Sequence, residues 1–141
     1  MRNRLDRWPI LVRGGILLIW MGGIFLFSSI PGSGNPYDPP MRYVLERKGA
    51  HVFEFALLTI LAFRFFRSLF GSGESWRRVA VLAVTFAFAY GALDELHQAF
   101  VFGRGSRFSD VGIDVLGSII ALGMIQIAFS FSSLKKIRKM L

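Results

Sequence analysis

Four long apolar stretches, roughly residues 10–29, 47–66, 79–99 and 110–131, are the feature that most constrains the fold of this chain. A helix needs about 20 residues to cross the hydrocarbon core of a bilayer, and each stretch supplies a helix of that size. Hydrophobic residues make up 53% of the chain, so most of its surface is expected to face lipid rather than water. The sequence therefore predicts an all-α, four-helix transmembrane bundle.

The connections between these stretches are short and contain strong helix breakers. Prolines and glycines occur in segments 31–40, 71–73 and 103–106. The 141 residues fit a single domain, which we take to span residues 1–141. The first stretch resembles a signal peptide, but residues 28–31 are a poor cleavage site, and we expect the helix to be retained.

The distribution of basic residues predicts the orientation of the chain. Most of the 17 lysines and arginines lie in the N-terminus, around the second connection and in the C-terminal tail. The positive-inside rule makes these segments cytoplasmic, so the chain is predicted to span the bacterial cytoplasmic membrane with both termini on its cytoplasmic side. A nucleic-acid partner is disfavoured, because the positive charge is split into short clusters between apolar runs.

Polar side chains gather at the predicted outer ends of three helices. They are Lys48, His51 and Glu54 on the second helix, Asp94, Glu95, His97 and Gln98 on the third, and Asp110 and Asp114 on the fourth. Spacings of three and four residues place them on shared helix faces, and Gly117 and Ala121 allow the fourth helix to approach a neighbour closely. Because lipid disfavours isolated charges, we expect one polar cleft, open to the extracytoplasmic side, with Arg104 and Arg107 over its mouth.

Three interpretations of this cluster compete with a ligand-binding role. Ion pairs among these residues could have a purely structural purpose and fix the helix register. A membrane hydrolase or transferase could use carboxylates as acid and base, and the catalytic candidates are Glu54, Asp94, Glu95, His97, Asp110 and Asp114. A divalent metal could assist such chemistry, with His51, Glu54, His97 and Asp110 as its candidate ligands. The chain has no cysteine, which excludes thiolate sites.

We favour a binding site for the phosphate or carboxylate of a lipid-linked headgroup. Guanidinium groups bind such anions through paired hydrogen bonds. Lipid headgroups carry these anions at the membrane surface, where the predicted arginines lie. The candidate ligand-binding residues are Lys48, His51, Gln98, Arg104 and Arg107. Membrane lipid is the expected partner, and the oligomeric state is left open.

The same residues resemble the VanZ-like family, small bacterial membrane proteins named after a teicoplanin-resistance protein. Segments 27–33, 48–55, 94–104 and 109–117 carry the resemblance in the expected order. The recurring signature of the family is matched here by Glu95, Gln98, Phe100, Arg104, Asp110 and Gly117. Asp114 differs, since the pattern of the named resistance protein often has asparagine there. The resemblance implies a role in the bacterial cell envelope and tolerance to teicoplanin-type lipoglycopeptides, but no particular reaction. We expect a lipid-linked cell-wall precursor or a lipoglycopeptide as the ligand.

Overall fold

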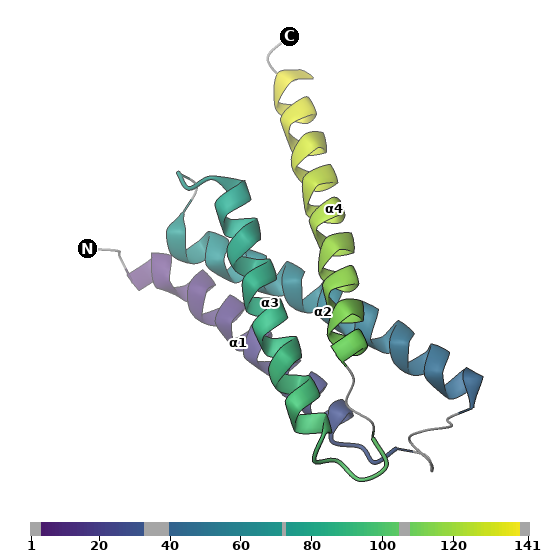
Figure 1. The fold of residues 1–141 in the computed structure, drawn as a ribbon. Coiled ribbons are helices and arrows are strands. Elements are labelled where there is room, and N and C mark those ends of the chain that lie inside the picture. The colour runs from purple at the N-terminus through teal and green to yellow at the C-terminus, as the bar shows by residue number, and fades with distance from the viewer. Residues whose placement is uncertain (1–3, 33–39, 72, 105–107, 139–141) are drawn as a thin grey trace.

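The computed structural model describes residues 4–32, 40–71, 73–104 and 108–138. These residues form four helices and no strand, as Figure 1 shows, so the predicted all-α fold is confirmed. The helices are α1 (Arg4–Ser28), α2 (Met41–Phe70), α3 (Trp76–Gln98) and α4 (Phe108–Arg138). Each helix begins before the apolar stretch that predicts it, and α2 and α4 also end beyond theirs, because helical hydrogen bonding continues into the polar flanking turns.

Three of the four helices are long and apolar enough to cross a membrane. The stretches that qualify are Trp8–Ser28, Trp76–Gln98 and Ser109–Phe131. α2 is not among them and carries Arg47, Glu54 and Arg64 along its length. With 30 residues, it is nevertheless about 45 Å long, which exceeds the thickness of a bilayer core.

α2 is the central helix of the bundle. It contacts α1, α3 and α4, whereas α1 contacts only α2 and α3 in the described part of the chain. The innermost core is formed by Phe55, Leu58 and Ala62 of α2 with Val79, Ala83 and Ala87 of α3, all 0% exposed. The alanines and the valine on α3 are small, so the two helix backbones can approach each other closely.

α4 crosses α2 with direct contact between the two backbones. A Cβ atom added at Gly117 would lie 2.4 Å from the carbonyl oxygen of Val52 and 3.1 Å from the amide nitrogen of Ala56. Only glycine fits at such a distance. This is the close approach that the spacing of Gly117 and Ala121 predicts.

The end of α1, the first half of α2, the end of α3 and the start of α4 meet at one end of the bundle, called the site end below (bottom of Figure 1). The segments that follow α1 and α3 are hydrogen-bonded to each other there, since the Gly32 amide donates to the Phe102 carbonyl oxygen at 3.1 Å. The start of α1 and the C-terminal half of α4 lie away from the site end (Figure 1). In that half of α4, Phe129 packs against Phe63 of α2 and Trp76 of α3. Which end faces the cytoplasm stays a prediction.

Candidate functional site

Gln98, at the end of α3, is the centre of the polar contacts at the site end. Its side-chain amide is 0% exposed, and its Nε2 donates to Asp94 Oδ2 at 2.6 Å. Its carbonyl oxygen accepts from Nη2 of Arg47 and, at 3.5 Å, from Nη1 of Arg104. A glutamine is suited to this position because one planar group both donates to a carboxylate and accepts from two guanidinium groups.

The two arginines are held in place by further contacts. Arg47 Nη2 lies 3.6 Å from Asp110 Oδ2, which joins α2 to α4. Arg104 donates from Nε to the Ile30 carbonyl oxygen at 2.8 Å and from Nη2 to the Phe27 carbonyl oxygen at 2.7 Å. Burial, followed by the nearby charge of Arg47, lowers the pKa of the Arg104 guanidinium, which still remains charged because arginine titrates far above neutral pH.

A buried histidine–carboxylate pair joins α2 to α4, one helical turn deeper in the bundle than Asp110. His51 Nδ1 is 2.9 Å from Asp114 Oδ1, and the two side chains are 6% and 1% exposed. An ionised carboxylate only accepts hydrogen bonds, so Nδ1 is the donor, and in the neutral imidazole Nε2 keeps its lone pair. Gly91 leaves room for the pair, because a Cβ there would lie 2.8 Å from Asp114 Oδ2.

The polar contacts continue one further turn into the bundle. The Ser118 hydroxyl donates to the Asp114 carbonyl oxygen at 3.1 Å. The Thr59 hydroxyl oxygen lies 3.0 Å from the hydroxyl oxygen of Ser118. Both side chains are buried. From Asp110 to Ser118 the polar residues therefore extend about 12 Å along α4, given a rise of about 1.5 Å per residue.

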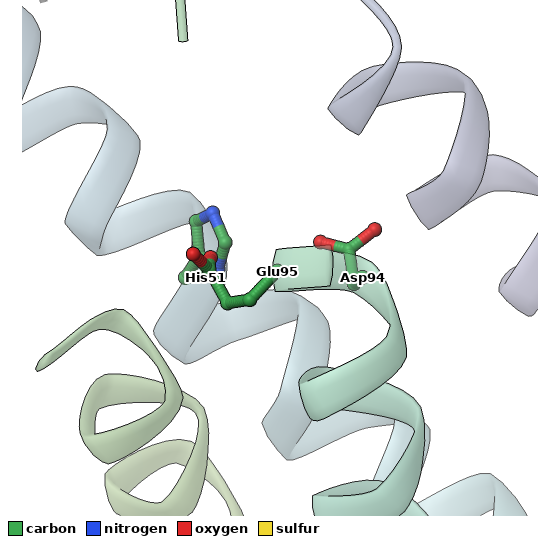
Figure 2. Close-up of side chains that lie close together, drawn as sticks. All are labelled: His51, Asp94 and Glu95. Carbon is green, nitrogen blue, oxygen red and sulfur yellow. The ribbon is translucent and has the colours of Figure 1, made fainter. Parts of the chain in front are cut away.

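His51, Asp94 and Glu95 form a compact group of donor atoms. One nitrogen of His51 and one carboxylate oxygen from each acid all lie within 4.8 Å of one another, and all three residues are buried. Figure 2 shows the Glu95 side chain extending from α3 toward His51 on α2. The type and spacing of these donors suit a divalent cation.

A cavity of about 210 Å³ opens beside these groups, between α1, α2 and the segment after α3. Its polar lining includes Arg47, His51, Glu54 and Arg104, and its apolar lining includes Phe27 and Ile30. The cavity thus combines charges of both signs with an apolar rim.

The comparison with protein families identifies the family of this chain. The VanZ/LLP1 family model matches residues 15–129, which is most of the chain and includes every polar contact described above. This chain belongs to the VanZ/LLP1 family. No curated protein and no solved structure matches it. The family and the apolar helices together identify a VanZ-like membrane protein.

The site residues that the sequence predicts are placed in three ways in the VanZ-like fold. Those that meet at the site end are His51, Glu54, Asp94, Glu95, Gln98, Arg104, Asp110 and Asp114. Lys48 is exposed and takes part in no hydrogen bond or ion pair among the described residues. Arg107 lies outside the described residues.

The spacing of three residues predicts that His97 lies beside Asp94 on one face of α3, but the ring of His97 contacts α1 instead. Its Nε2 lies 3.0 Å from the hydroxyl oxygen of Ser29, and its ring packs against Phe25 with centroids 4.5 Å apart. Since the Ser29 hydroxyl donates to the Phe25 carbonyl oxygen at 2.6 Å, His97 Nε2 is the donor to Ser29. The compact donor group therefore contains Asp94 and Glu95 with His51, and of the four predicted metal ligands it includes His51 alone.

Two contributions to the site escaped the sequence reasoning. Arg47 precedes His51 by four residues and Glu54 by seven, so the same helical stripe could have included it. The other is α1, whose carbonyl oxygens at Phe27 and Ile30 hold Arg104. Backbone carbonyls carry no residue-type signal, so nothing in the sequence indicates this contact.

Proposed function

We propose that this VanZ-like protein binds the polar headgroup of an amphiphilic, lipid-linked cell-envelope molecule at the extracytoplasmic face of the cytoplasmic membrane. The cavity at the site end is the observation that carries the proposal. Sites that enclose whole small molecules have volumes of about 300–1,000 Å³. At about 210 Å³ this cavity fits a headgroup, and the attached chain would remain in the surrounding lipid.

The anionic part of the headgroup would bind to Arg47. This side chain lines the cavity, and 18% of it stays accessible beside its contacts with Gln98 and Asp110. Arg104, on the same cavity, is held rigidly by two carbonyl oxygens and adds a second positive charge. Guanidinium groups held in advance bind a phosphate or carboxylate strongly, because little side-chain entropy is lost on binding.

The carboxylate of Glu54 would accept a hydrogen bond from an amine or hydroxyl of the same headgroup. It is half-buried and lines the cavity, and no hydrogen bond or ion pair among the described residues engages it. Trp20 of α1 donates to the Glu54 backbone oxygen at 3.1 Å, which secures the helix at this point. A headgroup with both an acidic group and an amine or hydroxyl satisfies Arg47 and Glu54 together.

The apolar rim supports an amphiphilic ligand. Phe27 and Ile30 line the cavity and are 60% and 54% exposed, so a hydrocarbon chain leaving the cavity would meet apolar side chains. Lipid-linked cell-wall precursors and lipoglycopeptides have this combination of a polar head and an apolar tail. Tolerance to teicoplanin-type lipoglycopeptides, which the family resemblance implies, would be the cellular consequence.

Binding by purified protein in detergent tests the proposal. Native mass spectrometry would compare a polyprenyl diphosphate, a phosphatidylglycerol and a teicoplanin-type lipoglycopeptide as ligands. Loss of one charged hydrogen bond costs about 1.5–3 kcal/mol, so Arg47→Gln and Glu54→Gln should each weaken binding about tenfold or more. Arg64→Gln is the matched control, because Arg64 is an exposed arginine farther along α2. Equal affinity in all four proteins, or an equal loss with Arg64→Gln, contradicts the proposal.

The orientation is tested in intact cells. The chain has no cysteine, so single cysteines report the side of the membrane on which they lie. A membrane-impermeant maleimide should label Phe102→Cys, at the site end and 87% exposed, and should not label Gly73→Cys, between α2 and α3. The reverse labelling would place the cavity in the cytoplasm and overturn the extracytoplasmic part of the proposal.

A further inference from the structure

We infer that His51, Asp94 and Glu95 form a binding site for a divalent transition-metal ion, with Asp114 orienting the histidine. This goes beyond headgroup binding, because it concerns other side chains and can be measured without any lipid. The donor atoms come from the middle of α2 and the last turn of α3, two helices that pack directly against each other.

The distances between the donor atoms fit an ion after a small movement. Zinc bonds to imidazole nitrogen and carboxylate oxygen are about 2.0–2.2 Å long, so two ligands of one ion lie within about 4 Å of each other. The three donors already lie within 4.8 Å of one another. Donor atoms of a tetrahedral zinc ion lie about 3.5 Å apart, so side-chain rotations that shorten the longest separation by up to about 1.3 Å would complete the contact.

Asp114 supplies the support that metal-bound histidines usually have. Such a histidine binds the ion through one ring nitrogen and donates its other N–H to a carboxylate, which fixes the ring. His51 Nδ1 donates to Asp114 Oδ1 at 2.9 Å, which leaves Nε2 available, and His51 also lines the cavity.

The same carboxylate provides a second, independent indication of a cation. Asp114 is 1% exposed, and its Oδ2 is buried without a hydrogen-bond partner among the described residues. This oxygen lies against Gly91, one turn before Asp94 and Glu95 on α3, and so faces the same group. A buried carboxylate oxygen that lacks a donor is costly unless positive charge is close by.

The charge balance of the group points in the same direction. Three buried carboxylates, those of Asp94, Glu95 and Asp114, surround the single imidazole of His51. Like charges this close disfavour full ionisation of all three groups, and a divalent ion would remove the repulsion. The other way to remove it is a proton shared between carboxylates, which the experiment separates from an ion.

The donor set also indicates the kind of ion. Imidazole suits zinc, and carboxylates suit manganese and are accepted by zinc, so Zn²⁺ and Mn²⁺ are the appropriate probes. Three protein ligands leave at least one coordination position open, as in zinc sites that bind water or substrate. Because His51 lines the cavity, an oxygen of a bound headgroup would be the fourth ligand.

Metal uptake by lipid-free protein tests the inference. Protein without a histidine tag is stripped with a chelator in detergent, dialysed against Zn²⁺ or Mn²⁺, and analysed by elemental mass spectrometry and calorimetry. We expect one ion per chain. His51→Gln, Asp94→Asn and Glu95→Gln should each remove most of the uptake, and Asp114→Asn should weaken the affinity about 10–100-fold, as loss of an orienting carboxylate does.

The controls are the matched residues outside the group. His97→Gln changes the other histidine of the chain, and Glu74→Gln changes an acid paired with Arg78 before α3, so both should keep full uptake. Size-exclusion profiles confirm folding, and the isosteric Asp94→Asn keeps an acceptor for Gln98 if another variant unfolds. Absence of stoichiometric uptake, or equal loss in the controls, overturns the ion site and favours a shared proton. Arg47→Gln separates the two proposals, since it should weaken headgroup binding about tenfold or more and leave ion uptake intact.

Discussion

The two halves of this bundle are held together in different ways. At the site end, α2, α3 and α4 are joined by directional contacts such as the Gln98 amide with Arg47 and the His51–Asp114 pair. In the other half, α3 and α4 are in apolar contact, as in the stacking of Trp76 on Phe129, and they border a groove of about 620 Å³. Its lining is mostly apolar and includes Trp76, Ala80, Val84, Ile119 and Leu122.

The difference between hydrogen-bonded and apolar contacts indicates that the site end tolerates fewer side-chain substitutions than the other half. Lipid is as apolar as the side chains that face it, so helices in a membrane are held by close packing and by hydrogen bonds. A hydrogen-bonded network requires one geometry, whereas an apolar groove that lipid can fill accepts many side chains. We therefore expect matched substitutions to be costly at the site end and mild in the other half.

Gly117→Ala should have the largest effect on stability. Its new Cβ would meet the Val52 carbonyl oxygen at 2.4 Å, and a backbone atom cannot rotate away. Overpacking of this kind costs about 1–3 kcal/mol or more, which should lower the unfolding temperature in detergent markedly. Gly123→Ala, on the same helix beside the groove, has no atom within 4 Å of its Cβ and should be neutral or slightly stabilising. Equal behaviour of the two variants would contradict the contrast between the halves.

Gln98→Met should have the next largest effect. The substitution keeps the length of the side chain but leaves Asp94 without its Gln98 donor and removes one acceptor from each of two guanidinium groups. A buried polar group without a partner costs about 1–3 kcal/mol, and headgroup binding should fall as well because Arg47 loses its support. Gln126→Met is the control, since Gln126 lines the groove and is exposed. Thermal unfolding and the native mass spectrometry assay would measure both consequences, and an unchanged Gln98→Met protein would remove Gln98 from the centre of the network.

Much of the fold follows from local properties of the sequence. The number of helices depends on the length of each apolar run and on the prolines and glycines between the runs, which are readable one segment at a time. The close approach of α4 likewise follows from Gly117, whose small size has no other use in the middle of a helix. Spacings of three and four residues also place Asp110 and Asp114 on one face, as observed.

The partners of the site residues were not predictable in the same way. Helical spacing places His97 near Asp94, yet the structure directs His97 to Ser29 and pairs His51 with Asp114. These choices depend on how α2 and α3 are rotated about their axes, which is set by contacts between distant segments, including the room that Gly91 leaves for Asp114. A single sequence contains no local signal for that rotation.

Lys48→Ala should have the smallest effect, although charge and spacing alone make Lys48 a candidate ligand-binding residue. Lys48 follows Arg47 directly, and a helix turns about 100° per residue, so the two side chains face different directions. Arg47 is drawn into the network, whereas Lys48 is exposed and pairs with no described residue. Exposed substitutions of this kind change stability by about 0.5 kcal/mol or less, and headgroup affinity should match that of the unmodified protein. If Lys48→Ala weakened binding as much as Arg47→Gln, the ligand would respond to the total positive charge near the membrane surface, and the contacts within the cavity would not explain its recognition.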